Sequence, residues 1–100
     1  MSFSANPANA EQCALNLLAA LVDAESNACI VIERLLRITG YVASVPTFTR
    51  QHIVVNSASD LLVKILGDAG LHTREAVGVV VLPLDAPVEI SAWALVRMVE

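Results

Sequence analysis

Positive charge is scarce in this sequence. Six lysines and arginines stand against ten aspartates and glutamates among 100 residues, which gives a formal net charge of -4 at pH 7. Such a chain has no general electrostatic attraction for a phosphate backbone or an anionic lipid surface. Aromatic residues make up only 4% of the chain, so no series of rings is available on which nucleic-acid bases could stack. We therefore expect no nucleic-acid partner.

Cysteines, leader signals and long apolar runs are also few or missing. Cys13 and Cys29 are too few for a disulfide framework and lack the close spacing of a metal site. The apolar stretch 14–22 resembles the core of a signal peptide, but no basic residue precedes Arg34, so the positive start of such a peptide is absent. No run approaches the roughly 18 apolar residues of a membrane span. These absences predict a cytoplasmic protein with no membrane partner and no metal.

Short motifs for nucleotides, activated serines or zinc are absent as well. The sequence contains no G-x-G-x-x-G, Walker A, G-x-S-x-G or H-E-x-x-H pattern, so we expect no cofactor. For the two histidines, His52 and His72, we expect ordinary surface or helix-terminal positions.

Apolar side chains are what the sequence has in abundance. They make up 56% of the residues, while charged residues make up 16%, against roughly a quarter in an ordinary soluble domain. A chain of this length forms one domain, residues 1–100, and a domain of that size buries only about 60 to 65% of its unfolded surface. The apolar excess is hard to hide in a monomer and predicts self-association.

Hydrophobic periodicity and capping signals predict two helices and three strands. The expected elements are a helix starting at Asn6-Pro7 or at Asn9 and ending within 23–27, a strand from Ile30 to before Pro46, a helix capped by Thr47 or Thr49 and stopped by Gly67 and Gly70, a short strand over 77–82 covered on both faces, and a strand over 88–99. The expected buried stripes are Ala14, Leu15, Leu17, Leu18, Leu21 and Val22 on the first helix, Val54, Ala58, Leu61, Leu62 and Ile65 on the second, and Leu36, Ile38, Gly40 and Val42 on the first strand.

The last strand indicates the fold class. One of its faces carries no polar residue, as expected beneath a layer of helices; it consists of Val88, Ile90, Ala92, Ala94, Val96 and Met98. The other face includes Trp93 and Leu95, which should not stand in water. Two helices cover only one side of a sheet. We therefore predict a two-layer α/β sandwich that oligomerises through its uncovered sheet face.

Glu89 is the candidate for chemistry on that uncovered face. It is a lone carboxylate on an otherwise apolar strand beside Ser91 and Trp93, where desolvation would raise its pKa. Two interpretations are open: Glu89 contacts a ligand, or it is a hydrogen-bonding residue of an interface.

Four segments in order resemble a branch of the RidA family, also called YjgF. They are CALNLLAAL at 13–21, RLLRITGYVASVPTF at 34–48, VVNSASDLL at 54–62 and HTREAVGVVVLPLDAPVEI at 72–90. The family carries labels such as reactive intermediate deaminase, L-PSP endoribonuclease and chorismate-mutase-like. The resemblance implies a chorismate-mutase-like α+β sandwich with two helices on one face of a mixed sheet. It also implies a homotrimer with ligand pockets in the clefts between subunits.

The resemblance also assigns site residues. The family's carboxylate in the last strand, which positions a water or takes a proton, falls on Glu89, and a pocket asparagine on the second helix falls on Asn56. The arginine that the deaminating members place directly before Leu-Pro of the penultimate strand, to grip the substrate carboxylate, is here Val81. Family members also have an N-terminal β-hairpin, which is lacking ahead of the first helix.

Three functions therefore stay open. The first is a trimeric protein that binds a small, uncharged or weakly polar molecule in its inter-subunit clefts, with Asn56 and Glu89 as polar contacts. The second is an enzyme that hydrolyses an imine or enamine with Glu89 as the catalytic group. It would need an anion-binding residue in place of Val81, and the candidates are Arg34, Arg37, Arg74 or Arg97 of a neighbouring subunit. The third is a truncated family member without activity. An endoribonuclease is disfavoured by the acidic charge and by the lack of an acid/base histidine arrangement.

Overall fold

The computed structural model describes residues 5–99 of the chain. Its elements follow in the order α1 (Pro7–Ala28), β1 (Ile30–Ala43), α2 (Gln51–Leu66), the 3-10 turn η1 (Gly67–Gly70), β2 (Thr73–Val79), the 3-10 turn η2 (Pro83–Asp85) and β3 (Val88–Met98). No helix in this part of the chain is long and apolar enough to cross a membrane.

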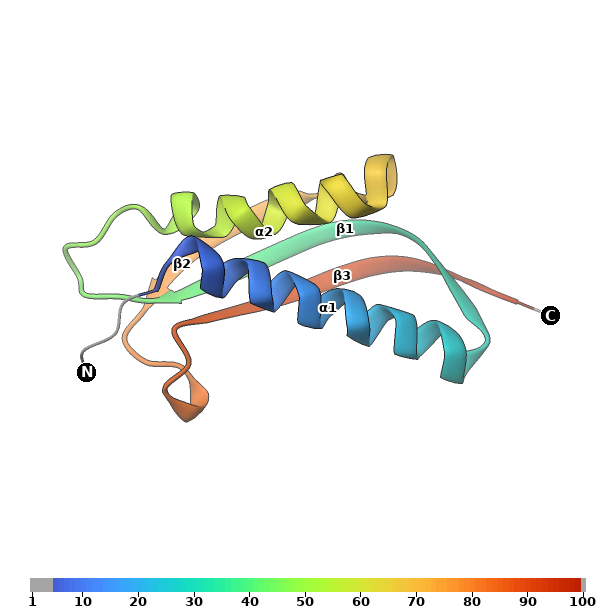
Figure 1. Cartoon of the computed structure of the whole chain (residues 1–100), viewed down its shortest axis with the longest axis horizontal. Helices are drawn as coiled ribbons and strands as arrows, with labels where there is room; N and C mark the ends of the chain where they lie inside the picture. The colour runs from blue at the N-terminus through green and yellow to red at the C-terminus, as the bar shows by residue number, and fades with distance from the viewer. Residues whose placement is uncertain (1–4, 100) are drawn as a thin grey trace.

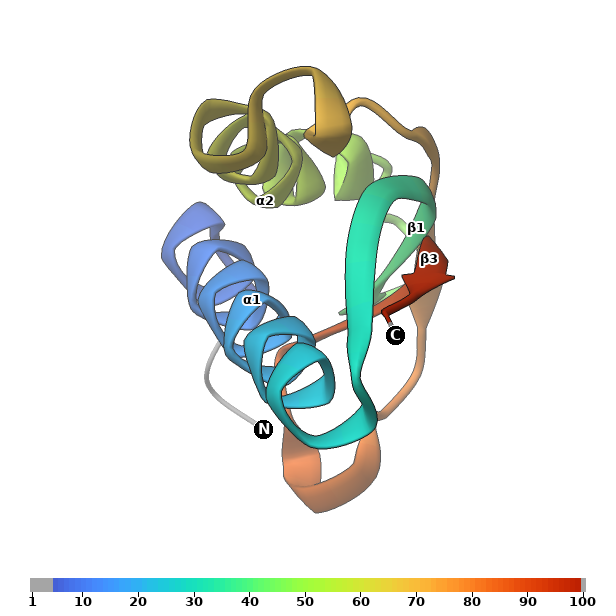
Figure 2. The same cartoon turned by 90° about the vertical axis from the view of Figure 1, so that its right-hand side faces the viewer.

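The three strands form one mixed sheet in the order β2-β1-β3. β1 runs parallel to β2 and antiparallel to β3. Figure 1 shows the helices lying along the strands, and Figure 2 shows both helices on the same side of the sheet. Within residues 5–99 no strand precedes α1. The predicted α+β two-layer sandwich is therefore confirmed, with both helices on one face.

α1 begins as its sequence predicts. Asn6 and Asn9 form a reciprocal capping box, in which each side chain accepts a hydrogen bond from the other's backbone N–H, and Pro7 occupies the first turn, where its missing N–H has no helical partner anyway. The helix ends at Cys29, whose φ of 52° is left-handed and redirects the chain into β1.

The buried stripes of the two helices are narrower than predicted. Ala10 and Ala14 of α1 are completely buried, whereas the predicted Leu15 and Val22 are exposed. On α2 the innermost residues are Val54, Val55, Ala58 and Leu62, and the predicted Ile65 is exposed. A three-stranded sheet is too small to cover a wide helical face, so the flanks of both stripes stay in solvent. The predicted threonine caps of α2 are also wrong, because the cap residue is Arg50 and makes no side-chain cap bond.

β1 is the central strand, and two irregularities break its alternation. The register against β3 shifts between Ile32 and Arg34 and again between Leu35 and Arg37. The second bulge inserts Leu36 as an extra residue, so Leu35 rather than Leu36 joins Ile38 beneath the helices. Leu35 is fully buried while Leu36 is 43% exposed, and the predicted burial of Leu36 is therefore wrong.

β2 differs most from its prediction. It spans Thr73–Val79 instead of 77–82 and is an edge strand that pairs with β1 alone. Val80 and Val81 follow the strand and are 90% and 66% exposed. The prediction of a strand covered on both faces is therefore wrong, because within residues 5–99 the helices cover only one face of the sheet and Val80 and Val81 lie beyond the end of its edge strand.

The sheet therefore has two faces with different surroundings. The covered face, beneath the helices, holds the core residues Leu35, Ile38, Val42 and Val88, with Ile90, Ala92 and Ala94 packed around them. The bare face has no layer over it within residues 5–99 and carries Arg37, Thr39, Tyr41, Glu89, Ser91, Trp93 and Leu95. Val96 and Met98, predicted in the core, are exposed because the end of β3 runs past the end of α2 (Figure 1).

Candidate functional site

A cluster of polar side chains joins α2 to the edge strand β2. Asn56 and Ser59 lie one turn apart on α2, and Arg74 of β2 alternates with the bare-face residue Glu75 and so points toward the helix layer. The Arg74 guanidinium donates through Nη1 to Asn56 Oδ1 at 2.7 Å and to Ser59 Oγ at 3.3 Å. The strand and the helix are thereby tied together by an arginine.

His72 extends this cluster and sets the direction of its hydrogen bonds. Its Nδ1 faces the carbonyl oxygen of Gly70, and its Nε2 lies 3.0 Å from Ser59 Oγ. A carbonyl oxygen only accepts, so in the neutral ring Nδ1 carries the proton and Nε2 accepts from the Ser59 hydroxyl. Ser59 Oγ then accepts from Arg74. The side chain of Arg74 is therefore held in one orientation.

Arg74 differs from the arginines of the bare face in having no carboxylate beside it. Arg37 pairs with Glu75, and Arg97 Nε lies 3.0 Å from Glu33 Oε1. Within residues 5–99 no carboxylate lies within ion-pair distance of Arg74. This half-buried guanidinium is oriented by neutral acceptors, so its positive charge is not neutralised by them and can attract an anion. Its fork of N–H donors matches the two oxygens of a carboxylate.

The three site residues expected from the sequence lie in three different places. Asn56 belongs to the cluster with Arg74. Glu89 alternates with the buried Val88 and so lies on the bare face, on the other side of the sheet. Val81 lies beyond the end of β2, in the wall of a cavity at the end of the sheet. A single chain therefore does not bring these residues together.

Glu89 nevertheless has an electrostatic neighbour. The Cys13 thiol of α1 donates to the Val88 carbonyl at 3.4 Å. Partial burial raises the pKa of Cys13 above its ordinary value, and the negative charge of Glu89 raises it further. Cys13 is thus held as a thiol, which suits a packing role and not that of a nucleophile.

The cavity has a volume of about 490 Å³ and lies between the β1–α2 loop and the segment after β2. Its apolar lining includes Phe48, Val80 and Val81, and Ser44 and Asp85 are the polar residues beside them. No group of three or more histidine, cysteine or acidic residues in the described part of the chain could hold a metal ion.

Sequence reasoning had not singled out Arg74, Ser59 or His72 as one cluster. His72 is half-buried and bridges η1 to α2, close to the end of the helical segment, one of the two positions expected for it. The sequence signal for the cluster was the alternation of Arg74 with Glu75 at the start of β2. A strand predicted over 77–82 leaves both residues outside the strand and so assigns neither of them to a face.

Comparison with known proteins adds three relatives. No family model matches the chain. The protein TCP17 of Trypanosoma cruzi is 40% identical over 90 residues, which cover 85% of this chain and 53% of TCP17. The crystal structure of Atu1372 from Agrobacterium tumefaciens, a protein with unknown function, is 42% identical, with a TM-score of 0.77, and the match covers 91% of this chain and 56% of that one.

The fold is shared with a second solved protein. A structure from Shewanella oneidensis MR-1, named a "putative endoribonuclease", matches with a TM-score of 0.76 and 27% identity over 85% of this chain and 56% of its own. The chain thus spans about half the length of each of these three relatives.

Proposed function

We propose that this chain is a RidA-like protein that binds a small molecule through a carboxylate or a similar anionic group. The observation that carries the proposal is the bond from Arg74 to Asn56 at 2.7 Å, with no carboxylate of residues 5–99 pairing with that arginine. The four segments of family resemblance and the fold shared with the Shewanella structure support it. The proposed ligand carries a charge, in contrast to the uncharged one expected while position 81 was taken as the anion-binding position.

The proposed binding unit is a homotrimer with its pockets between subunits. Arg74 and Glu89 occupy opposite faces of one sheet, so a pocket that uses both requires two chains. The bare face offers an apolar contact, because Trp93 is 70% exposed and Leu95 is 44% exposed. Burying such side chains against a second copy removes apolar surface from water.

Hydrolysis of an imine or enamine is the second candidate function. It is favoured by Arg74, which supplies the cationic group that the sequence lacks at position 81. In this reaction Glu89 of a neighbouring copy takes a proton from water as its oxygen attacks the imine carbon. Glu89 then returns this proton to the nitrogen, the C–N bond breaks as the new hydroxyl loses its proton to form the carbonyl group, and ammonia and the carbonyl product leave. Arg74 positions the substrate carboxylate for that attack.

The test is a calorimetric titration with 2-oxobutyrate, an unreactive keto analogue of a 2-imino acid. We expect Arg74→Ala to weaken binding by about tenfold or more, because a charge-assisted pair is lost. Asn56→Ala should weaken it less, and Lys64→Ala, an exposed cation of the last turn of α2, should leave it unchanged. Equal affinity of the unmodified protein and Arg74→Ala would exclude the proposed site.

Ammonia release from 2-iminobutyrate separates binding from catalysis. Turnover that Glu89→Ala abolishes, while 2-oxobutyrate binding persists, would establish the enzyme. Binding of 2-oxobutyrate without ammonia release would support the binding function and exclude the enzyme. The absence of both binding and ammonia release would favour an inactive family member.

A further inference from the structure

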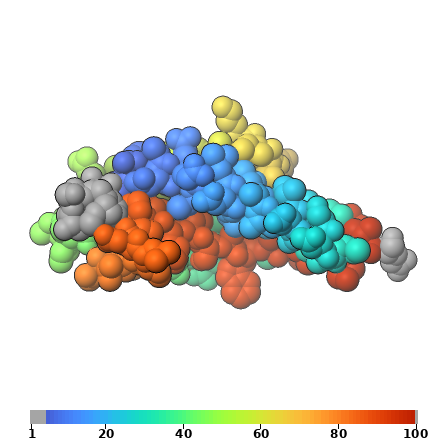
Figure 3. Space-filling model, turned by 60° about the horizontal axis from the view of Figure 1, so that its bottom comes forward, coloured from blue at the N-terminus to red at the C-terminus, as the bar shows by residue number. Residues whose placement is uncertain are grey.

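The cavity at the end of the sheet has the dimensions of a small-molecule site. Its volume of about 490 Å³ falls inside the range of about 300–1,000 Å³ that is usual for ligand pockets. Two segments supply most of its lining residues, the β1–α2 loop with Val45 and Phe48, and the segment after β2 with Val80 and Val81; the end of β1 and Ala5 supply the rest. Figure 3 shows the second segment (orange) standing out at the end of the molecule that also carries the loop (green).

Hydrogen bonds hold the first wall in place without a ligand. Gln51, the first residue of α2, donates through Nε2 to the Phe48 carbonyl at 2.8 Å and to Ser44 Oγ at 3.4 Å. The backbone N–H of Ser44 donates to the Val79 carbonyl at 3.0 Å, which fastens the loop to the end of β2. The cavity is therefore preformed, so little conformational entropy would be lost on binding.

Because Gly78 has no side chain, it leaves room for the brace formed by the hydrogen bonds of Gln51 to Ser44 and Phe48. A Cβ atom at position 78 would lie 2.6 Å from Gln51 Nε2 and 2.8 Å from Ser44 Oγ. Any larger residue would push the brace away from the strand.

One charged residue lines this apolar space. Among the described residues that line the cavity, Asp85 alone is ionisable. It sits in η2 after Leu84, and both residues have left-handed φ values, of 58° and 57°. Non-glycine residues adopt that conformation at a steric penalty, and such strain gathers at functional positions. The backbone N–H of Asp85 donates to the Leu82 carbonyl at 3.0 Å, which anchors this turn.

We propose that this cavity binds an amphipathic amine, a small molecule with an aromatic or branched apolar body and a protonated primary amino group. The body would fill the space between Phe48 and Val81, and the ammonium would pair with the Asp85 carboxylate. Charge complementarity selects this class, because the Asp85 carboxylate at the cavity attracts a cation and repels an anion, and a neutral apolar ligand would leave that carboxylate without a partner. The lining includes neither Arg74 nor Glu89, so the proposal is independent of the proposed function.

The experiment is a nuclear magnetic resonance titration of the full chain with three probes of one shape. They are 2-phenylethylamine, the neutral 2-phenylethanol and the anion 3-phenylpropanoate. We expect the amine to shift backbone amide signals of 44–48 and 80–86, with an affinity about three to five times that of the alcohol, as for a solvent-accessible ion pair. The anion should bind most weakly.

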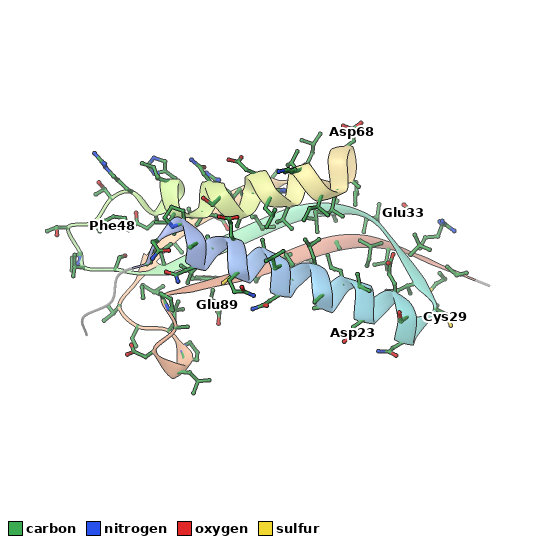
Figure 4. All side chains as sticks on the ribbon, in the orientation of Figure 1. Asp23, Cys29, Glu33, Phe48, Asp68 and Glu89 are labelled. Carbon is green, nitrogen blue, oxygen red and sulfur yellow. The ribbon has the colours of Figure 1, made fainter. Side chains whose placement is uncertain are left out.

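Two variants test the role of the carboxylate. Asp85→Asn removes the charge and keeps a residue that tolerates left-handed backbone, and it should abolish the preference for the amine over the alcohol. Val81→Arg adds a cation at an exposed position of the wall and should weaken the amine more than the alcohol. Asp68→Asn is the matched control, since Asp68 lies at the other end of α2 from Phe48 (Figure 4), and it should change nothing.

Three results would overturn the proposal. They are equal affinities of the unmodified protein for amine and alcohol, a preference for the amine that survives in both Asp85→Asn and Val81→Arg, and signal changes confined to the Arg74 cluster.

Discussion

The two faces of the sheet are made from the same strands but have different compositions. On the covered face, Leu35, Ile38 and Val42 are fully buried and no charged residue accompanies them. On the bare face, large apolar groups such as Trp93 and Leu95 stand beside the ion pairs Arg37–Glu75 and Arg97–Glu33. In a face that contacts only water, the exposed Trp93 would leave a large apolar surface hydrated. In a dry core, the ion pairs would lose their solvation. The bare face is suited to contact with another protein surface that retains a polar rim.

Removing a buried side chain should have the largest effect. Leu35→Ala deletes a completely buried side chain from the covered face and should lower the free energy of unfolding by about 3–4 kcal/mol. Leu36→Ala, at the bulged position next to it, should lower it by less than about 1 kcal/mol. Urea denaturation measures both. Equal losses for the two leucines would show that the bulge does not separate them between the faces.

Placing a charge on the bare face should act on assembly instead of folding. Trp93→Glu buries an unpaired carboxylate in the proposed interface and should weaken association by about 2–3 kcal/mol. The control is Val22→Glu, an exposed position on α1. Sedimentation equilibrium should show smaller species for Trp93→Glu alone. An unmodified protein that is monomeric at micromolar concentration would contradict the trimer.

Filling the narrow space beneath α2 should have a smaller effect. A Cβ atom on Gly40 would clash with Cγ2 of Val55, which is fully buried and has little room to move. Gly40→Ala should therefore lower the free energy of unfolding by about 2 kcal/mol through overpacking. Thr39→Ala, its neighbour on the bare face, should change it by less than about 0.5 kcal/mol. If the loss of stability is caused by the clash with Val55, the double variant Gly40→Ala with Val55→Ala should be more stable than the sum of the two single effects predicts.

The smallest effect concerns pH and the ion pair of the bare face. The hydrogen bond and the positive charge of Arg37 hold the pKa of Glu75 below its ordinary value. A pKa lowered by folding stabilises the protein above the unfolded-state pKa, and the contribution is lost as the pH falls through the folded-state value. Glu75→Gln should therefore reduce the acid sensitivity of unfolding only in that range, and weakly, since both side chains are exposed. An unchanged difference between neutral and acidic pH would show that the pair does not contribute.

Periodicity predicted α1, β1, α2 and β3, and capping predicted the start of α1, because these features are local in the chain. Asn6 and Asn9 cap a helix whatever packs against it, and the alternation after Val88 assigns each side chain to a face. Asn56 could be named from the family resemblance, but its partner Arg74 could not be found while β2 was placed over 77–82. That contact joins residues 18 positions apart on two different elements.

The sequence alone determined which segments are helical or extended, that apolar surface exceeds what one small domain can bury, and that Glu89 faces away from the helices. The tertiary structure decided which strand is central, which of two adjacent leucines is buried, and which arginine lies beside Asn56. The physical reason is that pairing in the sheet and the bulges in β1 depend on contacts between segments far apart in the chain. A run such as 76–82 is equally apolar at a sheet edge and at its centre, so composition by itself does not distinguish the two positions.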